Sequence, residues 1–101
     1  MDADRATLKA AVKASLARLQ EIAPGRSVEV RIPPFAAVQV VEGRTHRRGT
    51  PSAVVETDAE TWLALADGRL AWTEAIASGR LRASGERSDL SAYLPLGGTA
   101  R

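Results

Sequence analysis

The sequence predicts an α+β fold in which an N-terminal helix and C-terminal helices pack on one face of a mostly antiparallel sheet of four to five strands. Three observations predict it: an amphipathic segment opens the chain, several strand-like segments follow without helices between them, and further helical segments come late. With 101 residues the chain has the length of one domain, residues 1–101. We expect residues 97–101 to form a frayed tail.

The composition narrows the classes of function. The chain is 45% hydrophobic and 26% charged, as ordinary soluble domains are. It holds no cysteine, which excludes disulfides, thiolate catalysis and zinc sites with cysteine ligands. It lacks an apolar run of about 18 residues and opens on acidic residues, so we expect neither an integral membrane segment nor a secretory signal. The expected location is the cytoplasm.

Residues 4–23 predict an amphipathic helix, which Pro24 and Gly25 end. Its apolar stripe consists of Leu8, Val12, Leu16, Leu19 and Ile22. A membrane-surface helix is the alternative, because basic residues lie off this stripe. Such helices usually carry Trp or Phe, which the stripe lacks, so packing on the sheet is favoured. Residues 1–26 then form an N-terminal helix and turn.

Three strands are expected next. Residues 28–32 alternate between apolar and charged side chains, as in a half-buried strand, and Pro33–Pro34 interrupts the ladder. Residues 35–42 are nearly all apolar, which predicts a central strand. Residues 43–51 form an exposed loop or a ragged edge hairpin, and are the place for a fifth strand. Residues 53–57 predict the third clear strand.

Two short helices and a strand follow. Thr57 and Glu60 fit a capping box, with Thr57 as the N-cap of a helix that ends at Gly68. A second helix spans residues 72–77 and ends at Gly79.

The last elements are a strand and one more helix. Leu81 and Ala83 alternate with polar residues in a strand that Gly85 closes. Ser88 or Asp89 then caps a last short helix, which ends before Pro95.

Residues 55–94 resemble the C-terminal half of the sterol carrier, or non-specific lipid-transfer, family, and most closely its short actinobacterial-type members. In that family a strand runs into an acid-capped helix, and glycine–basic–apolar turns separate the elements that follow. The matching positions are Asp58, Trp62, Leu63, Leu65, Gly68, Arg69, Leu70, Ala75, Gly79, Arg80, Leu81, Gly85 and Glu86. We take residues 27–96 as the region of resemblance. The three glycines stand where a positive φ is favoured.

The resemblance implies non-catalytic binding of a fatty acyl chain, acyl-CoA or sterol in an apolar pocket between the sheet and the late helices. Large apolar side chains would line it, although plain core packing is the alternative reading of the same residues. The residues expected to contact the ligand are Phe35, Val38, Val40, Trp62, Leu65, Leu70, Trp72 and Ile76. An empty cavity of about 300 Å³ would cost about 7 kcal/mol. We therefore expect a pocket that is occupied, collapsed, or shared with a second subunit.

Arg44, Arg47 and Arg48 are the expected site for an anionic headgroup. Their guanidinium groups could hold the phosphates of acyl-CoA or of a lipid, and a solvated loop is the alternative. Nucleic acid is not expected as a partner, because no aromatic residues alternate with these arginines.

No enzyme activity, metal or cofactor is expected. His46 is the only histidine and lies in the basic loop, without the rigid support that a catalytic base needs. Asp58 and Glu60 are explained by helix capping. The alternative to a lipid carrier is a protein–protein interaction module, either a homodimer or an accessory subunit, with a filled core.

Overall fold

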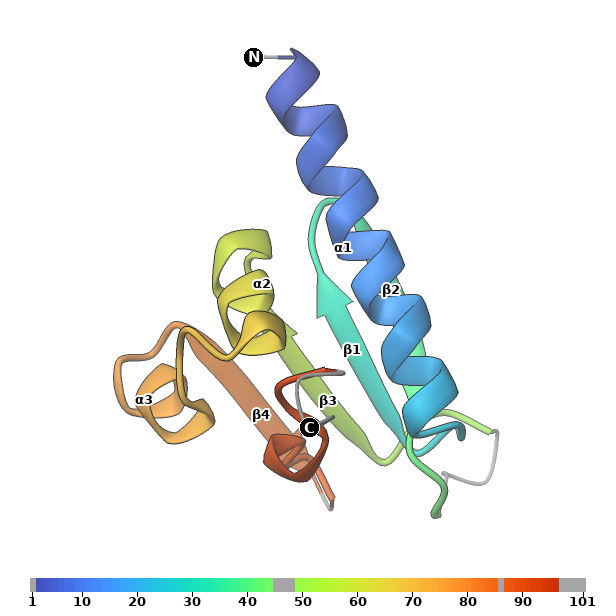
Figure 1. Cartoon of the computed structure of the whole chain (residues 1–101). Helices are drawn as coiled ribbons and strands as arrows, with labels where there is room; N and C mark the ends of the chain where they lie inside the picture. The colour runs from blue at the N-terminus through green and yellow to red at the C-terminus, as the bar shows by residue number, and fades with distance from the viewer. Residues whose placement is uncertain (1, 45–48, 86, 97–101) are drawn as a thin grey trace.

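The computed structural model describes residues 2–44, 49–85 and 87–96 (Figure 1). The elements are α1 (Asp2–Ile22), β1 (Val28–Ile32), β2 (Ala36–Val40), β3 (Ala53–Thr57), α2 (Ala59–Asp67), α3 (Trp72–Ala77), β4 (Leu81–Gly85) and the 3₁₀ turn η1 (Ser91–Tyr93). Each corresponds to a predicted element.

The sheet has the strand order β2-β1-β3-β4 and is mostly antiparallel, as predicted. β1 pairs with β2, and β3 with β4, in antiparallel fashion, while β1 and β3 are parallel. The parallel pair needs no crossover helix, because β2 returns the chain to the end of the sheet at which β1 begins. Within the described residues the sheet has four strands, and most of the segment expected to hold a fifth lies outside them.

The prediction that residues 35–42 form a central strand is wrong, because β2 lies at an edge of the sheet. Val38 and Val40 face α1, but the neighbouring Ala37 is exposed and Gln39 is polar. The segment is therefore rich in apolar residues without being covered on both faces. The segment therefore has the composition of an interior strand but lies at the edge of the sheet.

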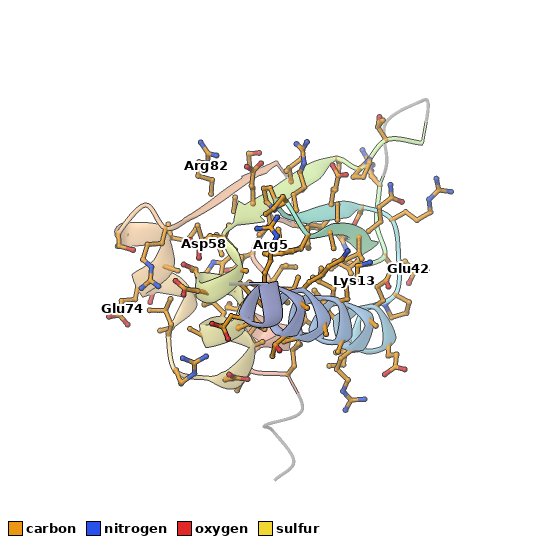
Figure 2. The ribbon with its side chains drawn as sticks, turned by 90° about the horizontal axis from the view of Figure 1, so that it is seen from above. Arg5, Lys13, Glu42, Asp58, Glu74 and Arg82 are labelled. Carbon is orange, nitrogen blue, oxygen red and sulfur yellow. The ribbon has the colours of Figure 1, made fainter. Side chains whose placement is uncertain are left out.

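Helices cover one face of the sheet, and the other face is polar (Figures 1 and 2). Val28, Val30 and Ile32 of β1 are fully buried toward the helices. On the opposite face, Glu56 pairs with Arg31 at 4.0 Å and with Arg82 at 3.4 Å. The apolar core thus lies between the sheet and the helical layer.

α1 packs on the core through the middle of its predicted apolar stripe, as expected, whereas Ile22 at the end of the stripe is 38% exposed. Val12, Leu16 and Leu19 are at most 1% exposed. With 21 residues the helix is about 31 Å long, whereas a five-residue strand spans about 17 Å. Its N-terminal turns therefore extend past the sheet (Figure 1).

The cap of α2 differs from the prediction by one residue. Asp58, and not Thr57, is the N-cap, and its carboxylate accepts a hydrogen bond from the Thr61 amide. Thr57 is the last residue of β3, and its hydroxyl donates instead to the Arg80 carbonyl at 2.6 Å. Thr57 stays in β3 because its hydroxyl is engaged with Arg80, the residue before β4. Asp58, the next residue with a side-chain acceptor, therefore caps the helix.

The three glycines of the family pattern have positive φ, as expected. Gly68 (82°) ends α2, Gly79 (78°) follows α3, and Gly85 (92°) closes β4.

Candidate functional site

The structure distributes the predicted ligand-contacting residues over three environments. Trp62 and Val40 lie in the closed core, where neither has any exposed surface. The Trp62 indole N–H donates to the Ser15 hydroxyl at 2.8 Å, which fixes the ring between α1 and α2. For these two residues the structure shows core packing, the alternative that the sequence left open.

A second group lines a groove between the end of α2, the start of α3 and residues 90–96, here called the C-terminal segment. This C-terminal groove has a volume of about 300 Å³. Its lining consists of Leu65, Gly68, Arg69, Leu70, Ala71, Trp72, Ser91, Leu94 and Pro95. Leu65, Leu70 and Trp72 are thus brought together by the fold.

Gly68 shapes the first wall of the C-terminal groove. Its backbone N–H donates to the carbonyls of Ala64 and Leu65, and the chain then reverses so that Leu70 and Trp72 flank the end of α2. Leu65 is 1% exposed and belongs to the core, while Leu70 and Trp72 are half-buried. The groove therefore has a core side chain among its lining residues.

The C-terminal segment forms the second wall. The Leu96 amide donates to the Ala66 carbonyl at 2.9 Å, which ties the segment to α2. The Pro95 ring packs so close to Gly68 that a Cβ on this glycine would lie 3.4 Å from it. Leu90 is fully buried and anchors the start of the segment. Sequence reasoning missed this wall, although the apolar spacing of Leu90 and Leu94 signalled it.

The chemistry of the C-terminal groove is apolar with a polar rim. Leu65, Leu70 and Leu94 supply aliphatic surface, and Trp72 supplies an aromatic ring. The exposed Arg69 side chain stands at the rim, where it pairs with Asp67 at 3.0 Å. Such a surface can hold a hydrocarbon tail while an anionic end remains near a guanidinium group.

Phe35 and Val38 line a different groove, between α1 and the outer strand β2. This edge groove has a volume of about 360 Å³. Its lining consists of Lys13, Leu16, Ala17, Gln20, Phe35, Ala36, Ala37 and Val38. The Arg5 guanidinium lies 5.1 Å from the centroid of the Phe35 ring, within range of a cation–π interaction.

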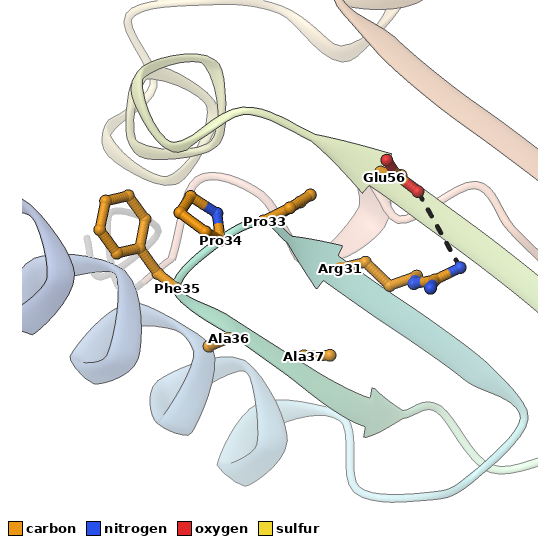
Figure 3. Close-up of a pocket in the computed structure, with 7 residues that line it drawn as sticks. All are labelled: Arg31, Pro33, Pro34, Phe35, Ala36, Ala37 and Glu56. Atoms are coloured by element: carbon orange, nitrogen blue, oxygen red, sulfur yellow. Dashed lines mark ion pairs between the residues drawn. The ribbon is translucent and has the colours of Figure 1, made fainter.

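A third groove, of about 490 Å³, lies at the β1–β2 turn (Figure 3). Pro33, Pro34 and Phe35 form its apolar part, and the Arg31–Glu56 ion pair forms its polar part. Phe35 thus separates two grooves. The charged part of this third groove makes it the less suitable of the two for a hydrocarbon chain.

Two predicted sites are not joined to these grooves. Ile76 is 40% exposed and lines none of the three. Arg44 is exposed and also lines none of them. Arg47 and Arg48, like His46, lie outside the described residues, so the headgroup site stays a prediction.

Two carboxyl groups in the described part of the chain have a shifted pKa, and both serve local structure. Partial burial raises the pKa of Asp58, but the hydrogen bonds from the Thr61 amide and hydroxyl, with the nearby Arg80, outweigh it and leave the pKa below its ordinary value. The Ser91 amide lowers the pKa of Asp89 by donating to it at 2.9 Å. Among the described residues no three Asp, Glu, His or Cys side chains gather as metal ligands would.

The sequence was compared with models of protein families and with curated proteins. A family model described as "bacterial SCP ortholog" matches residues 4–96, which is nearly the whole chain. No curated protein matches the sequence. None of the helices in the described part of the chain has the length and apolar character needed to cross a membrane.

Proposed function

The chain belongs to the sterol carrier family, as a bacterial SCP orthologue, and on this premise we propose that it binds a fatty acyl chain, free or as acyl-CoA, without catalysis. The tail lies in the C-terminal groove, against Leu65, Leu70 and Trp72. A groove of about 300 Å³ between short segments suits a flexible chain better than a rigid sterol ring system.

The observation that carries this proposal is the placement of Leu65. Its side chain is 1% exposed within the core cluster and also lines the C-terminal groove. A tail that displaces Leu94 from the groove gains contact with core side chains instead of surface ones. Burial of apolar surface at about 25 cal/mol per Å² then supplies the binding free energy.

A packed core in the free protein is compatible with a role as a lipid carrier. An empty cavity of lipid size would cost several kcal/mol, a large part of the roughly 5–15 kcal/mol that stabilises a domain. A groove that opens as the ligand enters avoids this cost in the free protein. The C-terminal segment is suited to such opening, because it packs over the groove rather than within the sheet.

A paired substitution tests the site. Leu70→Glu places a charge in the C-terminal groove, whereas Ile76→Glu places the same charge on the next helix, outside the groove. We expect Leu70→Glu to weaken binding of a fluorescent fatty acid at least about tenfold, since losing about 55 Å² of apolar contact costs about 1.4 kcal/mol. Ile76→Glu should bind like the wild type. Equal losses in both variants, or no wild-type binding at tens of micromolar, would contradict the proposal.

The headgroup sites can be separated by ligand chemistry. Alanine at Arg44, Arg47 and Arg48 together should weaken acyl-CoA binding and leave fatty-acid binding intact, because only acyl-CoA carries phosphates. Arg69→Ala should weaken both, since the rim of the groove would then lack its guanidinium group. Equal losses of both ligands in the triple variant would refute the phosphate role of the loop. We keep the cytoplasm as the compartment of this proposal.

A protein–protein interaction module is the second candidate function. A specific feature favours it, the exposed outer strand β2, and the partner that fits this strand is a second copy of the chain.

A further inference from the structure

The two edges of the sheet differ in their protection. At one edge, β4 carries the charged Arg82, and α3 packs beside the strand. At the other edge, β2 has the sequence Ala-Ala-Val-Gln-Val, without a charge or a proline. Natural proteins usually block an exposed edge with charges, proline or a cover, because its backbone groups can pair with another strand. β2 has none of these devices within the strand.

The surface beside β2 is shaped for close approach. The edge groove runs between α1 and β2, and its lining includes Leu16, Phe35 and Val38. The exposed lining combines the small Ala17 on α1 and Ala37 on β2 with the longer Lys13 and Gln20 on α1. On β2 itself Ala36 and Ala37 are small, so a neighbouring strand could approach this part of the β2 backbone closely.

We propose that a second copy of this chain pairs with β2, strand against strand and antiparallel, to form one continuous eight-stranded sheet across a two-fold axis. The axis passes near Val38, the central residue of the strand. Such an interface is isologous, since each copy offers the same strand to the other, and it closes at two copies. This inference goes beyond lipid binding, because it uses neither the C-terminal groove nor a ligand.

Charge complementarity favours a second copy of this chain as the partner that pairs with β2. Lys13 lines the edge groove together with Phe35 and Ala36, at the start of β2. Glu42 follows the end of the strand and is exposed. An antiparallel two-fold pairing brings the start of one β2 to the end of the other, so Lys13 of each copy faces Glu42 of the second copy. Both side chains are labelled in Figure 2.

These two charges are available for such contacts. The ion pairs found among the described residues join Arg18 to Glu21, Arg31 and Arg82 to Glu56, and Arg69 to Asp67. Lys13 and Glu42 take part in none of them. A parallel pairing of two β2 strands would instead place lysine near lysine and glutamate near glutamate, which like-charge repulsion disfavours.

A specific dimer needs more contact area than β2 alone provides. A stable interface buries about 800 Å² on each partner, more than a five-residue strand offers alone. α1 lies along the same edge, and its length lets two copies of the helix flank the junction. The edge groove would then be enclosed from both sides, so that the half-buried Phe35 and Val38 become part of the interface core.

Sedimentation velocity of the full chain between about 1 and 300 µM tests the dimer. We expect a monomer–dimer equilibrium in the wild type. Lys13→Glu and Glu42→Lys should each raise the dimer dissociation constant at least tenfold, because each creates two like-charge contacts across the axis. The double variant Lys13→Glu/Glu42→Lys should restore the wild-type constant to within about threefold.

Two control variants make the result decisive. Ser84→Lys adds a charge to the opposite edge, in β4, and should leave the dissociation constant unchanged. Leu70→Glu should also dimerise normally, so that a defect in lipid binding can be told from a defect in assembly. A wild type that stays monomeric over the whole range, or a double variant that fails to recover, would overturn the inference. Thermal unfolding of each variant checks that it is folded.

Discussion

The indole of Trp62 illustrates how single polar atoms hold the core together. Trp62 is fully buried, and its N–H donates to the Ser15 hydroxyl, which itself donates to the Val12 carbonyl at 2.8 Å. The bond joins residues 47 positions apart, so it ties α1 to α2. A buried polar group without a partner costs far more than a hydrogen bond contributes when formed. Ser15 therefore matters through the group it satisfies.

Ser15→Ala should lower the free energy of unfolding by about 1–3 kcal/mol, because it leaves the Trp62 N–H buried without an acceptor. In a Trp62→Phe background, which removes the donor, the same change should cost less than about 0.5 kcal/mol. Urea unfolding of the four proteins measures this coupling. Strictly additive losses would show that the hydrogen bond does not join the helices energetically.

The charge of Asp58 should make the free energy of unfolding depend on pH. Its pKa is lowered in the folded state, so its charge contributes stability that is present above its unfolded pKa of about 3.9 and is lost as the pH falls through the lower folded value. Asp58→Asn keeps a good capping residue but cannot ionise. The wild type should exceed this variant in unfolding free energy at pH 7, and the difference should shrink below about pH 4. If the difference in unfolding free energy between the two proteins stays constant between pH 7 and pH 3, the charge of Asp58 does not contribute to stability.

At the scale of elements, the junction of α1, β1 and β2 depends on a close approach of backbone to backbone. The Val41 amide donates to the Ala23 carbonyl at 2.7 Å, and the Ser27 amide and hydroxyl donate to the Val41 carbonyl. Gly25 lies against this segment with a φ of 150°, and a Cβ there would fall 2.1 Å from the Val41 carbonyl carbon. No rotamer change can relieve a clash with backbone.

Gly25→Ala should therefore destabilise the protein much more than Gly79→Ala. Gly79 also has a positive φ, but a Cβ at this position meets nothing within 4 Å, so its substitution should cost only about 1–2 kcal/mol of backbone strain. We expect Gly25→Ala to cost at least about 2 kcal/mol more. Chemical denaturation compares the pair directly. Similar losses in the two variants would mean that the junction shifts freely.

The elements also show where sequence reasoning reaches its limit. Periodicity and glycine positions predicted the type and order of the helices and strands, because the spacing of apolar residues marks the buried face of each element and glycine or proline marks its end. The position of β2 could not be predicted, since Ala36 and Ala37 count as apolar whether or not anything covers them. The cap of α2 was missed by one residue, because either Thr57 or Asp58 can cap a helix and only the strand pairing decides between them.

For the whole molecule, the sequence predicted the layers better than the candidate site. The eight residues expected to contact a ligand are all apolar, but apolarity does not say which side of a packed layer a residue faces. Trp62 and Val40 lie inside the core. Leu65, Leu70 and Trp72 line the C-terminal groove, and Phe35 and Val38 line the edge groove. The wall supplied by the C-terminal segment was missed because its docking on α2 depends on long-range contacts such as that of Pro95 with Gly68.

The two proposals give the molecule two separate working surfaces. The C-terminal groove lies beside α2 and α3, and the edge groove lies beside α1 and β2, and the two grooves share no lining residue. A dimer built on β2 would leave both C-terminal grooves accessible to ligand. Lipid binding and assembly should then be independent, so each can fail without the other.

The central claim, that an acyl chain enters beside Leu65, is tested most directly by NMR titration of the ¹⁵N-labelled protein with a medium-chain fatty acid. The two tryptophan indole signals serve as reporters and are assigned with a Trp72→Phe variant. We predict saturable shifts of the Trp72 indole and of the amides from Leu65 to Trp72 and from Ser91 to Leu96. Shifts confined to Phe35 and Val38, or no saturable shift at all, would contradict the account.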